Sequence, residues 1–169
     1  LKKLFPVWTS DIKDLDDAMR MIEEIGRITN REKNAASIAG KISEQFDNMH
    51  YSKSISCVYL IWNDPIMTIG GDTFINDMLS RAGFKNLTFD RQRYPQLTSA
   101  ELQTLNPECL LLSSEPYPFD QKHMNFYRDL LPNSKIVLAD GEMFSWYGSR
   151  LIKAPLYFSA LRSEIENAS

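Results

Sequence analysis

Three short apolar runs, separated by helical patterns, limit most strongly how residues 51–169 can fold. The runs are ISCVYLIW at 55–62, ECLLLSS at 108–114 and KIVLAD at 135–140. Each is continuous and apolar, as is typical of a strand that is buried on both faces. Strands that alternate with helices form parallel sheets covered by helices on both sides. The sequence therefore predicts an α/β unit of three layers, with a mostly parallel sheet flanked by helices.

The segments around these runs carry signals of their own. Helical patterns occupy 73–83, 98–106, 120–132 and 149–168, and NLTF at 86–89 indicates a short strand. Asp72 or Thr73 can cap the first of these helices, and Gly83 can end it. Pro155 predicts either a kink or a late start in the last helix, because proline is tolerated only in the first turn.

The first third of the chain is helical in pattern. Apolar residues recur at helical spacing in 9–29 and again in 30–50. Thr9, Ser10 or Asp11 can cap the first helix, and Asn30 can cap the second helix. Gly26 and the polar Thr29 and Asn30 suggest a break between them. A helix of about twenty residues spans about 30 Å, which is the width of a small domain. This segment is therefore predicted to be a long helical connector that can serve as a strut.

Charge and cysteine content exclude few classes of protein. The chain has 19 Lys and Arg against 22 Asp and Glu, and its net charge of -3 argues against a nucleic-acid partner. Cys57 and Cys109 lie inside apolar runs, where small buried side chains are a better interpretation than a disulfide or a reactive thiol.

The opening LKKLFPVWTS has a strand-like pattern, no initiator Met and no secretory leader. We therefore expect these residues to be the later part of a longer protein.

Aromatic residues follow each predicted strand. The three buried strands run into 62–65, 115–119 and 142–147, and the short strand is followed by Arg93, Tyr94 and Pro95. Ligands of open α/β sheets bind outside the carboxyl ends of the strands. Aromatic side chains there would form a rigid surface for a large flat ligand or for another protein. Any single ring could instead fold inward over a strand end, so the prediction of a binding surface concerns the set.

Catalytic and metal-binding arrangements have little support. His50 and His123 have no metal-ligand spacing around them, so exposed histidines on helices are the favoured interpretation. The GGDTF stretch at 70–74 is glycine-rich but lacks the lysine of a phosphate loop, which favours a tight turn followed by a helix cap. Asp64, Glu115 and Glu142 could form an acid pair for hydrolysis. We expect no catalytic residue, no metal site and no cofactor.

Several segments together resemble a known family. They are GGDTFINDMLSRAGFKN, YPQLTSAELQTLNPECLLLSS and SKIVLADGEMFSWYGSR, the last of which leads into the final helix. Their order resembles the carboxyl-terminal lobe of the periplasmic binding proteins that serve cobalamin, ferric siderophore and haem ABC importers, also called helical-backbone metal receptors. The segment 7–46 is similar to that family's helical connection between lobes. The resemblance thus covers nearly the whole chain.

The resemblance implies a domain division and a function. Residues 1–50 would be the helical inter-lobe connector and residues 51–169 the α/β carboxyl-terminal lobe, with the amino-terminal lobe absent from this chain. Such a receptor performs no chemistry, holds cobalamin or a metal chelate between its lobes, and delivers it to an ABC permease in the membrane. It would be periplasmic or associated with the cell envelope. The chain would be either a fragment or a naturally halved receptor, and its bare aromatic edge could pair with a second copy.

The family's ligand contacts come from loops at the strand ends that face the cleft. By position, the ligand-binding residues of this chain are Trp62, Asn63, Glu115, Pro116, Tyr117, Met143, Phe144, Trp146, Tyr147 and Arg150. Arg150 matches a basic residue that commonly opens the last helix, either as a ligand contact or as a helix-start residue. Two alternatives stay open: a module that binds another protein through the aromatic loops, and a small α/β hydrolase that uses Asp64 or Glu142.

Overall fold

The computed structural model describes Leu4 and residues 7–167. The rest of the strand-like opening, residues 1–3, 5 and 6, lies outside the described residues, and 7–13 form no strand. The helices are α1 (Leu15–Ile28), α2 (Glu32–Asp47), α3 (Phe74–Arg81), α4 (Ser99–Leu105), α5 (Gln121–Leu130), α6 (Gly141–Ser145), the 3-10 helix η1 (Ser149–Ile152) and α7 (Ala154–Asn167). The strands are β1 (Ile55–Trp62), β2 (Met67–Thr68), β3 (Phe84–Asn86), β4 (Cys109–Ser113) and β5 (Lys135–Ala139). No described helix is long and apolar enough to cross a membrane.

The sheet confirms the predicted α/β class. Its order is β2-β1-β4-β5, with β3 also paired to β1. β3, β4 and β5 join the sheet through parallel pairs, and only the two-residue β2 is antiparallel. The predicted strand at 86–89 is displaced to Phe84–Asn86, and β2 has no counterpart among the predicted strands. A strand of two residues is too short to show alternation or an apolar run.

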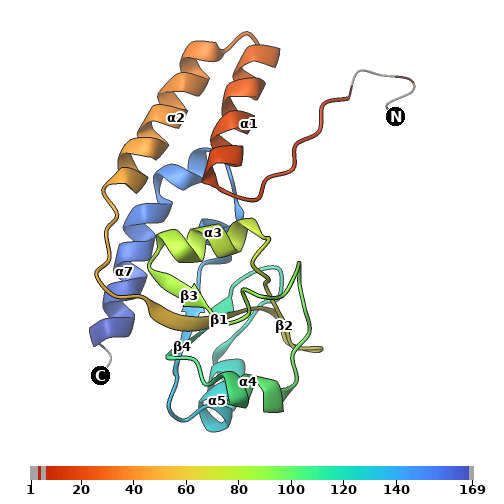
Figure 1. Ribbon diagram of the computed structural model, residues 1–169, viewed down its shortest axis with the longest axis vertical. Helices are drawn as coiled ribbons and strands as arrows, with labels where there is room; N and C mark the ends of the chain where they lie inside the picture. The colour runs from red at the N-terminus through yellow and green to blue at the C-terminus, as the bar shows by residue number, and fades with distance from the viewer. Residues whose placement is uncertain (1–3, 5–6, 168–169) are drawn as a thin grey trace.

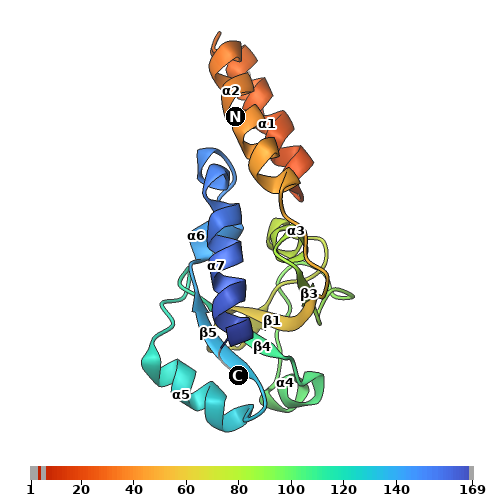
Figure 2. The same ribbon diagram turned by 90° about the vertical axis from the view of Figure 1, so that its left-hand side faces the viewer.

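Two apolar clusters, one on each face of the sheet, join it to the helices on both sides. The three layers are therefore helices, sheet and helices. Side chains of β1 and β4 that point to one face pack with α1, α2, α3, α6 and α7. Those that point to the other face, among them Val58, Leu60, Leu110 and Leu112, pack with α4 and α5. Figures 1 and 2 show α4 and α5 at the end of the molecule opposite the α1–α2 hairpin. Every side chain of β4 is buried, which explains its unbroken apolar sequence.

Local capping chemistry sets most helix starts. Thr73 caps α3 as predicted, and Thr98 caps α4 through a reciprocal capping box with Glu101. The predicted cap of the first helix is wrong: Asp14, rather than Thr9, Ser10 or Asp11, accepts a hydrogen bond from the Asp17 amide at 2.8 Å. The late start predicted from Pro155 is confirmed, because α7 begins at Ala154 after the separate helix η1.

The first third forms two helices, as predicted, and they pack against each other as a hairpin. α1 and α2 lie side by side in both views (Figures 1 and 2). Gly26 lies within α1 and is buried, and a Cβ atom there would overlap Ala35 Cβ of α2. The predicted break between the helices is confirmed at Thr29 and Asn30, whereas Gly26 itself lies inside α1 and permits the two helices to touch. Asn30 has a φ of 54° and forms the turn between the helices, while Arg31 occupies the cap position.

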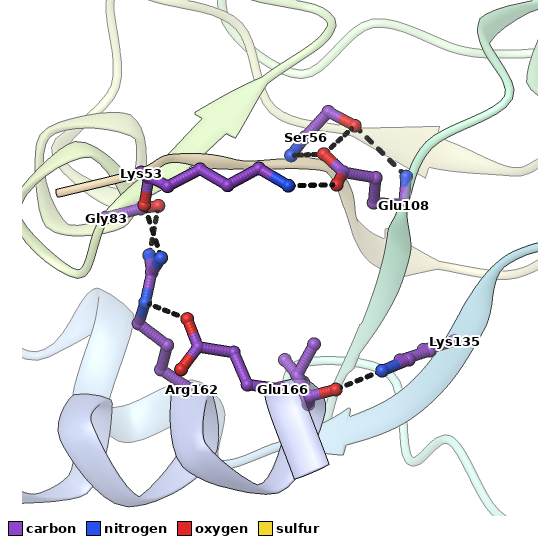
Figure 3. A network of polar contacts seen from close by, with 8 residues as sticks. Lys53, Ser56, Gly83, Glu108, Lys135, Arg162 and Glu166 are labelled. Carbon is purple, nitrogen blue, oxygen red and sulfur yellow. Dashed lines mark hydrogen bonds and ion pairs between the residues drawn. The ribbon is translucent and has the colours of Figure 1, made fainter. Parts of the chain in front are cut away.

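Arg162 of α7 binds the segment that follows α2 and the residue that follows α3 (Figure 3). Its side chain lies on α7 and is only 4% exposed. The guanidinium donates hydrogen bonds to the Gly83 carbonyl at 2.6 Å, to the Lys53 carbonyl and to Glu166 at 2.9 Å. It also lies 4.5 Å from the centre of the Tyr51 ring. Gly83 follows α3 with a φ of 76°, so this clamp depends on a left-handed residue at the predicted helix end.

Both cysteines are buried strand residues, as predicted. Cys57 on β1 and Cys109 on β4 are directly opposite each other in the parallel register. Both thiols are free, and neither side chain is accessible to solvent. Contact with the Cys109 thiol, together with burial, raises the pKa of Cys57 well above its usual value. Cys57 is therefore packed into the core as an uncharged thiol.

Candidate functional site

A largely apolar hollow of about 520 Å³ lies at the carboxyl end of β1. Its walls include Trp62, Tyr94, Glu115, Pro116 and Ser145. Trp62 ends β1, and Glu115 and Pro116 follow β4, so parallel neighbours bring these side chains together. The structure thus groups three of the predicted site residues around one concavity.

Tyr117 supports the hollow from the side. Its ring lies 5.4 Å from that of Trp62 in an edge-on contact. Its hydroxyl is within 2.9 Å of His123 Nε2, and the His123 Nδ1 accepts a hydrogen bond from the Asp120 amide. His123 is therefore a half-buried part of the α5 cap, and the prediction of an exposed histidine is wrong for this residue. Asn63 is likewise engaged, because its side chain accepts a hydrogen bond from Tyr127 at 2.9 Å.

A second hollow of about 380 Å³ lies beside the first and has a different character. Its walls are formed by Trp146, Tyr147, Ser149, Arg150 and Lys153, at and around η1. Trp146 is 50% exposed and Tyr147 is 45% exposed. The Tyr147 ring contacts Phe74 of α3 at 5.4 Å, which fixes one edge of the ring while the other edge meets solvent. Two aromatic rings and two cations therefore meet at the start of the last helix.

Glu115 joins the two hollows. Its Oε1 atom accepts hydrogen bonds from Trp146 Nε1 at 2.7 Å and from Ser145 Oγ at 2.8 Å. The backbone under it is fixed as well, because Ser113 Oγ donates to the Glu115 carbonyl and Tyr59 donates to Ser113 Oγ. Burial raises the pKa of Tyr59, so the hydroxyl keeps its proton for this bond. The carboxylate thus holds the indole of Trp146 in one orientation.

Arg150 holds Trp146 from the other side. Its guanidinium donates to Glu142 and lies 5.4 Å from the centre of the Trp146 ring. A guanidinium near an aromatic face is attracted by the ring's electrons. Arg150 therefore acts both as a wall of the second hollow and as a support for Trp146.

Phe144 does not reach the surface. It is fully buried in α6, with its ring 5.2 Å from that of Tyr59 and 4.6 Å from that of Phe158. Met143 is partly buried against the same core cluster. The loop expected at 142–147 is partly the short helix α6, and the helical turn directs Phe144 inward. Phe144 is thus unable to contact a ligand at this edge, as foreseen for any single ring that covers a strand end.

Glu115 and Glu142, two of the three carboxylates named for hydrolysis, have structural partners. Glu115 binds Ser145 and Trp146, and Glu142 binds Arg150. Within residues 4 and 7–167, no three His, Cys, Asp or Glu side chains gather where they could hold a metal ion. The arrangement is suited to binding a ligand through aromatic faces, apolar walls and a few fixed charges.

Tyr94 and Lys153 line the hollows but were not among the predicted site residues. Tyr94 is 47% exposed, and its loop is fastened beside β2 by hydrogen bonds from Thr68 N to the Pro95 carbonyl and from Gly70 N to the Arg93 carbonyl. The aromatic residue after the short strand was the available signal for Tyr94. No sequence feature indicated that Lys153 lines a hollow, because residues 149–152 were expected to be part of the last helix.

Comparisons with known proteins point in one direction. No family model matches the chain. Over 110 residues it is 30% identical to the uncharacterized ABC transporter substrate-binding lipoprotein YvrC of Bacillus subtilis, which covers 60% of this chain and 35% of that protein. The chain thus spans about a third of this relative's length.

Solved structures match over nearly all of the chain. A possible iron-binding, periplasmic solute-binding protein of Staphylococcus epidermidis superposes with a TM-score of 0.76 at 22% identity, covering 94% of this chain and 65% of that one. The periplasmic vitamin B12 binding protein BtuF of Vibrio cholerae gives 0.72 at 14% identity, covering 98% and 68%. Proteins described as Fe3+-hydroxamate transport and haem-binding components match as well. The chain therefore has the fold of the periplasmic binding proteins of iron-chelate, vitamin B12 and haem ABC importers.

Proposed function

We propose that this chain is part of the ligand-binding component of an ABC importer for cobalamin or an iron-bearing chelate such as a siderophore or haem. The observation that carries this proposal is the pair of adjacent hollows at the carboxyl ends of β1 and β4, joined through Glu115 and Trp146. Partly exposed rings of Trp62, Tyr94, Trp146 and Tyr147 face this region. Fixed aromatic rings bind a large ligand at a low entropic cost.

The shared fold and the Bacillus relative support the same assignment. In this proposal residues 1–50 connect two lobes and residues 51–169 form one of them. The ligand is held against this edge and passed to an ABC permease, and the receptor itself performs no chemical reaction. The protein is then located in the periplasm or attached to the cell envelope.

The contacts support distinct roles for the site residues in this proposal. Trp62, Tyr94 and Pro116 form apolar walls, and Trp146 presents an indole face whose edge is bound to Glu115. Tyr117 and Asn63 act from behind this surface through their bonds to His123 and Tyr127. Affinity then depends on rings that are already positioned before the ligand arrives, which reduces the entropy lost on binding.

Tryptophan fluorescence can test this proposal. The full-length protein is titrated with cyanocobalamin, haemin and ferric chelates, with correction for ligand absorbance. Trp62 and Trp146 lie at the proposed site, whereas Trp8 is bound to Glu24 of α1 and is replaced by Phe to remove its signal. We expect saturable quenching by at least one of these ligands.

A double variant provides the control. Trp62→Ala with Tyr94→Ala removes two walls of the larger hollow and should weaken binding about a hundredfold, at 1 to 2 kcal/mol for each ring. Phe126→Ala, on an exposed ring of α5, should leave the affinity unchanged. The absence of binding by all three ligand classes would refute the proposal, and would favour a protein partner for the aromatic edge.

A further inference from the structure

We infer that the ligand of this site carries an anionic group, a carboxylate or another charged oxygen, which binds between Arg150 and Lys153 beside Trp146. This inference rests on the proposed function and narrows its ligand class. It favours chelates with an apolar or conjugated body and anionic substituents over uncharged chelates.

The smaller hollow has an excess of positive charge. Arg150 and Lys153 both line it, together with the hydroxyl group of Ser149. Glu142 is ion-paired to Arg150 and compensates one of the two charges. Lys153 is exposed, and no carboxylate of the described residues forms an ion pair with it. One full positive charge thus stays available to a ligand.

The last helix adds to this field. α7 has 14 residues and begins at Ala154, directly after Lys153. The amino end of a helix carries a partial positive charge from its unpaired amide groups. Two side-chain cations therefore line the hollow directly before the start of this helix, and Glu142 keeps the Arg150 guanidinium in place.

The larger hollow is suited to the uncharged body of the same ligand. Its walls are mainly apolar, among them Ile61, Trp62, Ile75 and Pro116. Its one carboxylate, Glu115, already accepts hydrogen bonds from Ser145 and Trp146 and so has less capacity to bind a cation. Since Trp146 bonds to Glu115 and also lines the smaller hollow, a ligand of bipartite character can contact both.

Four probes of matched character test this inference on the full-length protein. Haemin carries two carboxylates and its dimethyl ester carries none, so this pair changes only the charge of the substituents. A trianionic ferric tris-catecholate and an uncharged ferric tris-hydroxamate form the second pair. The two pairs distinguish a porphyrin carboxylate from the charged oxygens of an iron chelate.

We expect the anionic member of at least one pair to bind about tenfold or more tightly than its uncharged partner, as for one close charge contact near a protein surface. Lys153→Glu should abolish that preference, and Lys153→Arg should retain it. Lys122→Glu is the control, because it makes the same change of charge on α5, which lies away from the start of α7 (Figure 2).

Four results would overturn the inference. Equal binding of both members of each pair would show that charge is not recognised, and an unaltered preference in Lys153→Glu would place the charged group elsewhere. Tight binding of the uncharged probes alone would overturn the anionic class but leave the proposed receptor function intact. Binding of none of the four probes, nor of cyanocobalamin, would refute both proposals together.

Discussion

Trp146 shows how a single exposed ring can be kept in one orientation. Its indole edge is bound by Glu115, and one face lies near Arg150, which is itself bound to Glu142. An unsupported indole at half exposure would sample several rotamers and would lose that freedom when a ligand binds. The two carboxylates therefore hold Trp146 in one orientation, which in the proposed site reduces the freedom lost when a ligand binds.

Replacing Glu115 tests this support. In Glu115→Ala, Trp146 and Ser145 lose their acceptor, so ligand affinity should fall about three- to tenfold, in line with about 1 kcal/mol for one hydrogen bond. Glu115→Gln keeps an acceptor oxygen and should restore most of the affinity. With Trp8 and Trp62 replaced by Phe, the emission of Trp146 should shift to longer wavelength in the Ala variant only. A uniform loss of affinity in both variants, without a spectral shift, would contradict this role.

Glu108 gives the fold a dependence on acid pH. The amide and hydroxyl of Ser56 donate to its carboxylate at 2.8 and 2.9 Å, and these bonds together with Lys53 lower the pKa of Glu108 (Figure 3). A lowered folded pKa adds stability above the unfolded value of about 4.3, and this stability is lost as the pH falls through the folded pKa.

Glu108→Gln should therefore reduce the free energy of unfolding by about 0.5 to 1 kcal/mol at pH 7, a small value because the side chain is half exposed. The difference from wild type should shrink progressively below pH 4. Urea unfolding between pH 2.5 and 7 measures it. Glu23→Gln, at an exposed position of α1, should show no such dependence. A constant difference across this range would contradict the assignment.

At the scale of elements, the α1–α2 hairpin depends on one close contact. Gly26 and Ala35 are the small residues that let the two helices approach. Gly40, on α2, has open space around its position, so a methyl group would meet no neighbour there. The two glycines thus have opposite roles within one hairpin.

Gly26→Ala should destabilise the protein by about 1 to 3 kcal/mol, because the added methyl group forces the helices apart. Gly40→Ala should stabilise it by about 0.5 to 1 kcal/mol, because alanine has the higher helix propensity. Thermal unfolding of both variants measures the difference. Equal effects of the two substitutions would show that the hairpin contact does not control packing here.

The sequence predicted elements best where the signal was local and repeated. The apolar runs of β1, β4 and β5 identified the parallel sheet, and Thr73 identified the start of α3. The signal failed where tertiary packing overrides local preference, as at Gly26, which ends helices elsewhere but here is buried against Ala35. It failed also where an element is very short: β2 and α6 have two and five residues.

The helical turn of α6 explains which site residue could not be placed correctly from the sequence. The sequence placed Trp62, Glu115 and Trp146 after strand ends and Arg150 at the opening of the last helix, and the structure brings their side chains to adjacent hollows. It gave no way to tell the buried Phe144 from the exposed Trp146 two positions later, because only the helical turn between them separates their directions.

At the scale of the whole molecule, Arg162 of α7 links the segment after α2 to the end of α3. Arg162→Met keeps the apolar stem but leaves the carbonyls of Gly83 and Lys53 without their donor, at a cost of about 2 to 3 kcal/mol. Amide hydrogen exchange should then speed up at residues 49–56 and at the end of α3, but not in β4. Arg128→Met on α5 should leave these rates unchanged. Uniform acceleration throughout the chain would indicate a global loss of stability instead.

The sheltered thiols of Cys57 and Cys109 have a practical consequence for spectroscopy. Neither side chain is accessible in the folded state, so a maleimide dye should react with neither thiol. It should react only with a cysteine introduced on the surface. A label placed at Gln103 on α4 and another at Ser37 on α2 would then need no background cysteine to be removed. Single-molecule distances between the two dyes could follow how the hairpin and the sheet move relative to one another while a ligand enters and leaves.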